Sequence, residues 1–179
     1  IKDLESMSDL DLATISFGHT NSVISVQYMA AFNAIANGGT WITPHLLKEV
    51  VTRDSYGTII VDSTYNQGQE KRLLREDSTA LLRTYLERVV TEGSGMNAYI
   101  EGYNIAGKTG TAEKVVDGEY GKGKYISTFV GMAPFEDPQI TIMVTIDEPS
   151  TGAYYAGEVA APVAKQVLTE TFNYLSLKI

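Results

Sequence analysis

Apolar side chains recur at helical spacing in three separate stretches of the chain. The first stretch covers about residues 22–37, with Ser25 as a plausible N-cap and the Gly38-Gly39 pair as its end. The second covers residues 76–91 and the third about residues 158–175. Spacing of three and four residues places such side chains on one face of a helix, so the pattern predicts three amphipathic helices.

Two of these predicted helices carry a continuous apolar stripe. In the second helix the stripe consists of Leu81, Leu82, Tyr85, Leu86, Val89 and Val90. In the third it consists of Val163, Val167, Leu168, Phe172 and Leu175. The simplest interpretation of both stripes is packing against a hydrophobic core.

Alternation of apolar and polar residues predicts strands between the second and third helices. Residues 105–112, 125–133 and 139–147 have this pattern, and a polar segment at 115–124 reads as a long hairpin tip. Strands joined by hairpins form an antiparallel sheet, so the fold class is α+β, with helices packed on that sheet.

The rest of the chain gives weaker signals. A smaller hairpin is expected from the runs 46–53 and 58–62, with a turn at residues 54–57. Segments 6–12 and 63–72 read as irregular.

The strand at residues 105–112 is unusual because it carries small and polar side chains where a core strand would carry bulk. Alternation puts Thr109 and Thr111 on one face and Lys108 and Gly110 on the other. Two hydroxyls beside a cationic side chain suit recognition of an anion. Gly110 has no Cβ, so a neighbouring backbone or a substrate can approach closely there.

Composition narrows the classes of function. The chain of 179 residues is 44% hydrophobic, which is ordinary for a globular domain. A net charge of −8 without a basic stripe argues against nucleic acid as a partner. The absence of cysteine excludes thiol catalysis and disulfides, and the spacing of His19 and His45 gives no metal site. No run of 18 apolar residues exists that could span a membrane.

Several ordered sequence blocks resemble the class B penicillin-binding proteins, the transpeptidases of bacterial division, elongation and spore cortex synthesis. The resemblance covers nearly the whole chain. Its blocks are residues 13–18, 34–39 (Ala-Ile-Ala-Asn-Gly-Gly), 106–112 (Ala-Gly-Lys-Thr-Gly-Thr-Ala), 129–134, 154–157 and 159–163. Lys-Thr-Gly is the third motif of penicillin-binding proteins and serine β-lactamases. The resemblance implies a partial penicillin-binding-protein/serine β-lactamase-like transpeptidase fold.

The first two motifs of that family are not found in the chain. No serine has a lysine three residues later, and no Ser-x-Asn occurs. We therefore expect residues 1–179 to be the C-terminal portion of a single transpeptidase domain, whose N-terminal portion carries the nucleophile. The fragment alone is expected to be inactive and to expose an apolar patch, which the N-terminal portion of the domain, a symmetry mate or a dimer partner covers.

The resemblance also implies the chemistry of the full enzyme, which is transfer of an acyl group through a serine. Thr109 and Thr111 would hold the substrate carboxylate, with Lys108 and Gly110 also in the substrate site. Lys108 would act in catalysis by reaching toward the serine of the family's second motif and keeping the site positive. The backbone N–H of Thr111 would be one of two oxyanion donors. The partners would be peptidoglycan stem peptides and β-lactam antibiotics, with no cofactor. The location would be the outer face of the bacterial membrane, reached through an anchor upstream.

Two other functions remain open at this point. A serine β-lactamase or β-lactam sensor would share the fold, although the segment 115–124 and the Ala-Asn-Gly-Gly block favour the transpeptidase. A non-catalytic scaffold that kept the fold for binding is the other alternative. A Ser-x-x-Lys motif upstream would support catalysis over the scaffold.

Overall fold

The computed structural model describes residues 3–16, 18, 21–65, 70–116, 119–150 and 152–175. The helices are η1 (Leu4–Ser6), α1 (Asp9–Ile15), α2 (Ser25–Ala36), α3 (Glu76–Thr91), η2 (Met96–Ala98) and α4 (Ala156–Leu175). The strands are β1 (Thr40–Ile42), β2 (Glu49–Arg53), β3 (Ile59–Thr64), β4 (Glu70–Arg72), β5 (Ala106–Val116), β6 (Glu119–Ala133) and β7 (Ile140–Asp147). None of the helices in this described part combines the length and apolar character that crossing a membrane requires.

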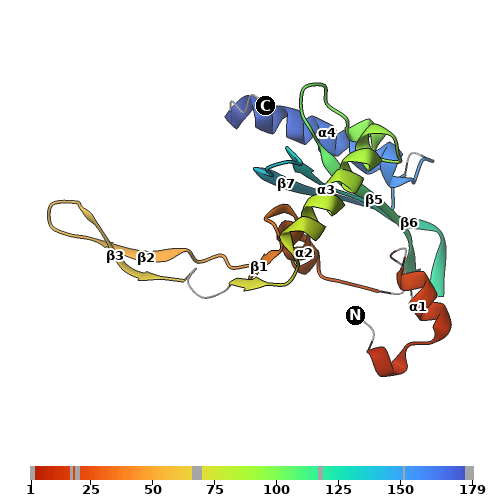
Figure 1. The fold of residues 1–179 in the computed structure, drawn as a ribbon, viewed down its shortest axis with the longest axis horizontal. Coiled ribbons are helices and arrows are strands. Elements are labelled where there is room, and N and C mark those ends of the chain that lie inside the picture. Colours follow the sequence, from red (N-terminus) through yellow and green to blue (C-terminus); the bar gives the residue numbers. More distant parts are fainter. Residues whose placement is uncertain are drawn as a thin grey trace.

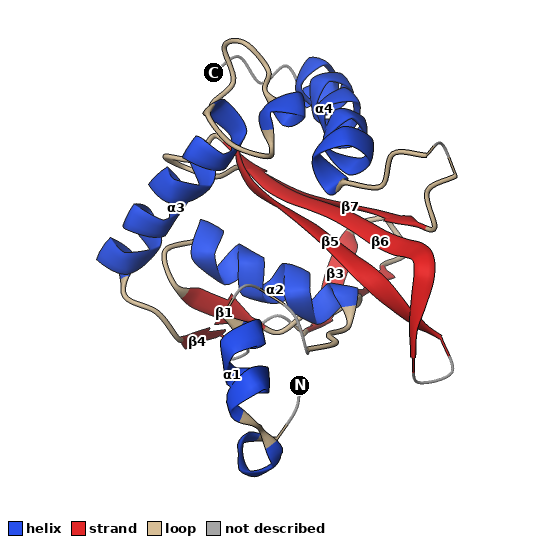
Figure 2. Cartoon of the chain, turned by 90° about the vertical axis from the view of Figure 1, so that its right-hand side faces the viewer, coloured by secondary structure: helices blue, strands red, loops and turns tan. Residues whose placement is uncertain are grey.

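A three-stranded antiparallel sheet in the order β5-β6-β7 forms the centre of the fold. Figure 2 shows α4 over one face of this sheet and α2 over the other. The register pairs Lys108 with Val130 and Thr109 with Phe129. Directly paired residues share a face of the sheet. Successive residues of β5 therefore point alternately toward α2 and toward α4. The α+β class and the antiparallel sheet are confirmed.

Two buried clusters hold the layers together. Phe129 on β6 packs under α4 with Leu168 and Phe172. Val130 and Met132 on the opposite face of β6 pack with Phe32 of α2. The alternation predicted for β7 is confirmed, because its isoleucines and Val144 pack in the α4 cluster while Met143 packs in the α2 cluster.

Most side chains of the apolar stripe of α3 do not lie in the hydrophobic core of this chain, contrary to the prediction. Val90 is buried and Leu86 is partly buried, but Leu81 and Tyr85 are 53% and 54% exposed. The reason is that α3 packs against α2, η2 and β5, which cover only one side of the stripe. The helix itself has the predicted bounds, Glu76–Thr91.

The buried face of α4 also differs from the prediction. Leu168 and Phe172 are buried as expected, whereas Val163 and Val167 are 41% and 46% exposed. Four alanines form most of the buried face instead: Ala156, Ala160, Ala161 and Ala164. Small side chains let the helix axis lie close to the sheet. A stripe of large apolar residues at helical spacing does not include these alanines, so it does not reveal the buried face.

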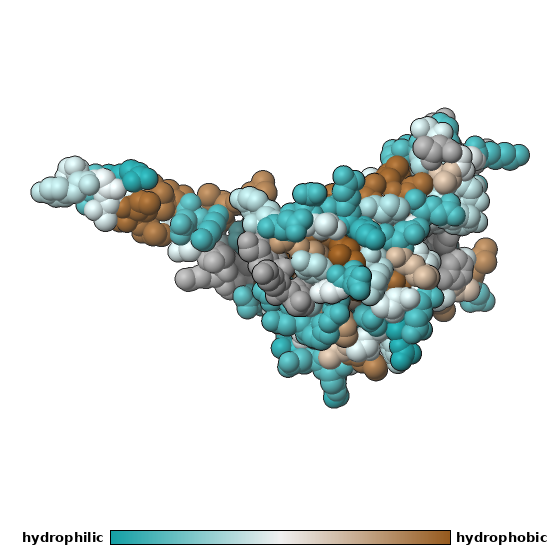
Figure 3. Space-filling model, turned by 90° about the horizontal axis from the view of Figure 1, so that it is seen from above, coloured by the Kyte–Doolittle hydropathy of each residue, from teal (hydrophilic) through white to brown (hydrophobic). Residues whose placement is uncertain are grey.

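A hairpin of β2 and β3 projects from the body as an arm (Figure 1). It matches the predicted small hairpin, and its turn is held by Asp54, whose side chain accepts backbone N–H bonds from Tyr56 and Thr58. Its apolar residues are all exposed, namely Val50, Val51, Ile59, Ile60 and Val61. Figure 3 shows these side chains as an apolar patch on the arm.

Three local predictions were wrong. Segment 6–12 is not irregular, because Ser8 and Asp11 form a capping box that starts α1. Segment 63–72 contains the end of β3 and strand β4, which pairs with β1. Ser25 is the first residue of α2, not its N-cap, since Ile24 occupies that position without a side-chain bond.

The hairpin tip is also shorter than predicted. Strand β5 continues to Val116 and β6 begins at Glu119, so most of segment 115–124 is strand. Residues 117 and 118, at the tip itself, lie outside the described residues, as does His19.

Gly107 is the position of closest approach within the sheet. A Cβ built on Gly107 would lie 2.5 Å from Cζ of the buried Phe129 ring and 2.7 Å from the carbonyl oxygen of Val130. Because neither the ring nor the backbone can move freely, Gly107→Ala should lower the free energy of unfolding by about 1–3 kcal/mol. Urea denaturation measures this change.

The matched control is Gly110→Ala, three residues along the same strand. A Cβ there would meet only the carbonyl oxygen of Thr128, at 4.0 Å. The control should therefore change the unfolding free energy by no more than about 0.5 kcal/mol. Equal destabilisation by the two substitutions would show that packing on Phe129 is not what requires glycine at position 107.

Candidate functional site

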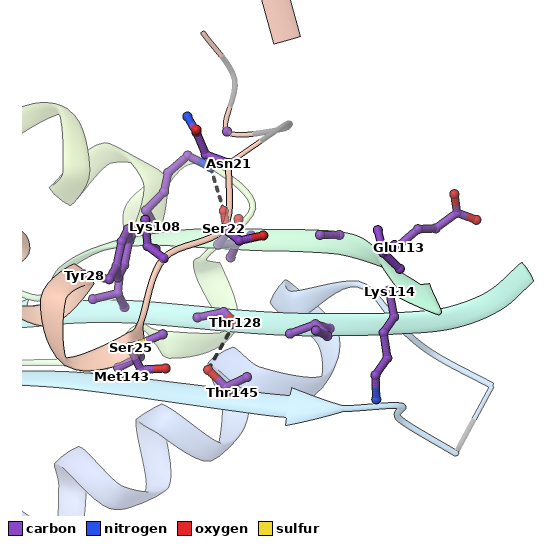
Figure 4. A pocket seen from close by; sticks show the side chains of 18 residues that line it. Asn21, Ser22, Ser25, Tyr28, Lys108, Glu113, Lys114, Thr128, Met143 and Thr145 are labelled. Carbon is purple, nitrogen blue, oxygen red and sulfur yellow. Dashed lines mark hydrogen bonds between the residues drawn. The ribbon is translucent and has the colours of Figure 1, made fainter. Parts of the chain in front are cut away.

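A groove of about 760 Å³ lies between strand β5 and the segment that leads into α2. Figure 4 shows Thr128 and Thr145 on the strands that form its floor, Ser25 and Tyr28 on the α2 side, and the Lys108 side chain extending toward Asn21. Burial raises the pKa of the Tyr28 phenol above its ordinary value. Lys108, Gly110, Ala112 and Lys114 contribute to this groove, as expected for alternate residues of one strand, and Thr109, Glu113 and Val115 border it as well.

Lys108 is exposed and lies on the groove face of β5. Its Nζ donates a hydrogen bond to the carbonyl oxygen of Thr109, at 2.7 Å. A lysine ammonium has three donors, so further donors remain for a ligand. The side chain therefore supplies positive charge at the strand edge.

Thr109 lies on the opposite face from Lys108, as predicted. Its hydroxyl is 2.6 Å from the hydroxyl of Ser94, which lies in the loop between α3 and η2. That loop is fixed against the start of α4, because the Asn97 side chain donates to the carbonyl of Gly157. Gly157 is needed there, since a Cβ would lie 2.3 Å from the carbonyl oxygen of Ser94.

Thr111 lies on the same face as Thr109 and contacts the N-terminus of α4. Its hydroxyl oxygen accepts a hydrogen bond from the backbone N–H of Ala156, at 2.9 Å. A hydroxyl that accepts in this way keeps its own proton for another acceptor. The positive end of the dipole of a 20-residue helix is therefore adjacent to this hydroxyl.

The glycine of the motif has open space beside it in this chain. The nearest backbone atom to a Cβ at Gly110 would be the carbonyl oxygen of Thr128, at 4.0 Å, and the close approach in this strand is at Gly107. The expectation that neighbouring backbone requires Gly110 is therefore wrong for the described residues. The other half of that expectation, close approach of a substrate, stays a prediction.

Three tyrosines form a stack beside the threonine face. Tyr125 stacks on Tyr154 with ring centroids 4.0 Å apart, and Tyr154 contacts Tyr155 at 4.5 Å. The carbonyl of Tyr154 accepts a bond from the hydroxyl of Ser127, the residue that pairs with Thr111. The hydrogen bond to the Tyr155 hydroxyl is the main reason that the pKa of Tyr154 is raised to about 12.

Sequence reasoning placed Lys108, Thr109, Gly110 and Thr111 on one strand and assigned their faces correctly. It missed Ser94 and the tyrosine stack, which come from distant segments. The triplet Gly93-Ser94-Gly95 follows the end of the helix predicted at residues 76–91. A serine between two glycines could have signalled a close approach of backbone. In the described residues, no cluster of histidine and carboxylate side chains could hold a metal ion.

Comparison with known proteins identifies the family. The transpeptidase model, described as the penicillin binding protein transpeptidase domain, matches residues 3–169. Stage V sporulation protein D of Bacillus subtilis is 37% identical over 175 residues, which are 98% of this chain and 27% of that protein. Probable peptidoglycan D,D-transpeptidase PenA of Neisseria meningitidis is 31% identical over 94% of this chain and 26% of its own length.

Solved structures give the same result. The transpeptidase domain of Burkholderia pseudomallei penicillin-binding protein 3 has a TM-score of 0.77 and 32% identity, covering 99% of this chain and 50% of that one. Penicillin-binding protein 3 of Mycobacterium tuberculosis, solved with ampicillin, has a TM-score of 0.84 and 25% identity, covering 100% of this chain and 41% of that one. The chain spans half or less of the relatives it matches. The agreement of family model, sequence relatives and fold shows that the chain belongs to the penicillin-binding protein transpeptidase family.

Proposed function

We propose that the chain is the C-terminal portion of a peptidoglycan D,D-transpeptidase domain and forms one wall of its catalytic cleft. The observation that supports this most is the edge of β5, where a cation and two threonine hydroxyls flank one exposed strand segment. The N-terminal portion of the same domain would supply the nucleophile, because no serine of this chain has a lysine three residues later, as the Ser-x-x-Lys motif requires.

The reaction is acyl transfer from a D-Ala-D-Ala stem peptide. A serine Oγ attacks the penultimate carbonyl, the bond to the terminal D-alanine breaks, and that residue leaves as an amine. An amine of a neighbouring stem then takes the acyl group and frees the serine. A β-lactam acylates the same serine by opening its ring.

In this proposal the residues of β5 bind the anionic end of the substrate. The hydroxyls of Thr109 and Thr111 donate to the carboxylate, and Ser94 supports the first of them through the 2.6 Å contact. Lys108 and the N-terminus of α4 add positive potential, which favours an anion.

The backbone of Thr111 is the proposed oxyanion donor. In the described sheet β5 pairs with β6 on one side and is otherwise an edge strand. The carbonyl oxygen of Thr109 accepts a hydrogen bond from the Lys108 side chain, as expected if this carbonyl points away from β6. Residues two apart on a strand direct their backbone groups to the same side, so the N–H of Thr111 would also face the cleft.

The same proposal extends to the site of action. The reaction uses a polymer outside the cytoplasm, so the full-length protein would work at the outer face of the bacterial membrane. The exposed apolar residues of α3, including Leu81 and Tyr85, would pack against the N-terminal portion of the domain.

Replacing Lys108 tests the anion site directly. In the full-length protein, Lys108→Ala should slow acylation by a fluorescent penicillin roughly a hundredfold, because the cation near the developing charge is lost. The melting temperature should stay within a few degrees, since the side chain is exposed. Lys165→Ala, on the exposed face of α4, is the matched control and should acylate normally. Normal acylation of the Lys108 variant would contradict the anion site.

Gly110→Val tests whether substrate passes beside the strand. A Cβ at this position has room in this chain and valine favours a strand, so folding of the variant should be unimpaired. Acylation should nevertheless be blocked, because the branch fills space on the groove face next to Lys108. Stopped-flow acylation and thermal melting, measured on one preparation, separate the two effects. A valine variant as active as the wild type would show that no substrate approaches Gly110.

A further inference from the structure

Lys114 lies where the regular pairing of β5 with β6 is interrupted. Regular pairing of β5 with β6 ends at Glu113 opposite Tyr125 and resumes at Val115 opposite Tyr120. One residue of β5, Lys114, therefore faces an excursion of β6 that covers residues 121–124. A bulge of this kind bends the hairpin and redirects the strands beyond it.

The side chain of Lys114 reaches across the sheet to the end of β7. Its Nζ lies 2.9 Å from both carboxylate oxygens of Asp147 and 2.9 Å from Oε1 of Glu148. Figure 4 shows the side chain crossing β6 in this direction. The hydrogen bond to Asp147 is the largest contribution that raises the pKa of Lys114 above its ordinary value.

Glu148 marks the point where the chain leaves the sheet. It has a positive φ of 51°, which is uncommon for a residue other than glycine. Its backbone N–H donates to the carbonyl of Tyr125, and its side chain also lies 3.7 Å from Nζ of Lys124. The turn out of β7 is thus held by backbone and side-chain bonds together.

The segment that starts at Glu148 is fastened to β5 at both ends. At its start, Lys114 binds the side chains of Asp147 and Glu148. At its end, Thr111 accepts the N–H of Ala156. Between these two attachments lie Tyr154 and Tyr155, which stand beside the threonine face.

We infer that Lys114 is a positioning residue, which acts through Asp147 and Glu148 to hold residues 148–150 and 152–156 against the edge of β5. This inference rests on the proposed function, because the geometry it maintains is that of the proposed acylation site. Lys114 also lines the groove, but its Nζ already makes three hydrogen bonds, two to Asp147 and one to Glu148, so its proposed role is to hold these carboxylates and not to bind substrate. Its side chain is 29% exposed, and partly exposed ion pairs add little to stability. The effect of losing it should therefore appear in the geometry of the site more than in the stability of the fold.

The test compares variants of the full-length protein for acylation by a fluorescent penicillin. Lys114→Met keeps the length of the side chain and removes its charge, and it should lower the acylation rate roughly tenfold to a hundredfold, since small displacements in a site cost this much. Lys114→Arg should recover most of the loss, because a guanidinium can bind a carboxylate through two bonds. Lys122→Met is the matched control, a lysine of the same excursion for which the described structure records no ion pair.

A mutant cycle separates positioning from a direct role. The combined variant Asp147→Asn with Glu148→Gln should lose about as much rate as Lys114→Met, and adding Lys114→Met to it should cost little more. Hydrogen exchange at residues 152–156 should be faster in Lys114→Met, while exchange in α3 stays unchanged.

The outcomes distinguish this inference from the proposed function. Wild-type acylation in Lys114→Met, alongside loss of acylation in Lys108→Ala, would overturn the inference and leave the proposed function standing. A further full loss of rate when Lys114→Met is added to the carboxylate variant would also overturn it, since Lys114 would then act independently. A wild-type protein that penicillin does not acylate would overturn both.

Discussion

A hydrogen bond from the backbone N–H of Ala156 to the hydroxyl of Thr111 joins helix α4 to strand β5 at the candidate site. It attaches the N-terminus of α4 to the edge strand of the sheet. The approach of α4 depends on its small residues, since Gly157 touches the backbone of Ser94 and the alanines of α4 pack on β6 and β7. Together with the Asn97–Gly157 and Ser127–Tyr154 hydrogen bonds, this contact keeps the helix dipole, the Ser94 hydroxyl and the tyrosine stack close to Thr109 and Thr111.

The two faces of β5 have different roles, and the strand edge brings them together. Lys108 and Gly110 face the groove below α2, whereas the threonine hydroxyls contact Ser94 and the start of α4, and Thr109 borders the groove as well. A ligand lying along the edge can meet both faces, because the edge of a sheet exposes side chains from each side as well as unpaired backbone groups. An acyl-transfer site needs hydroxyl donors for a carboxylate and backbone donors for an oxyanion, and such an edge offers both. In the proposed enzyme, the nucleophile would approach this edge from the N-terminal portion of the domain.

Much of this arrangement could be predicted from the sequence, because it depends on local periodicity. The alternation in residues 139–147 gave β7, and the motif strand gave the correct faces for Lys108 and Thr109. Ser94 and the tyrosines could not be placed, because their proximity to β5 depends on how α4 packs. The exposed side chains of Leu81 and Tyr85 show the limit of stripe analysis, which detects an apolar face without identifying what covers it. The contacts of Lys114 could not be predicted either, since its partners lie 33 and 34 residues further along the chain.

The most direct measurement is a crystal structure of the full-length protein acylated by a β-lactam. The account predicts the β-lactam carboxylate within hydrogen-bonding distance of the hydroxyls of Thr109 and Thr111, with Lys108 on the opposite face of the strand. It also predicts the acyl carbonyl oxygen about 3 Å from the backbone nitrogen of Thr111. An acyl group attached to a serine of this chain, or a carboxylate bound away from the edge of β5, would contradict the account.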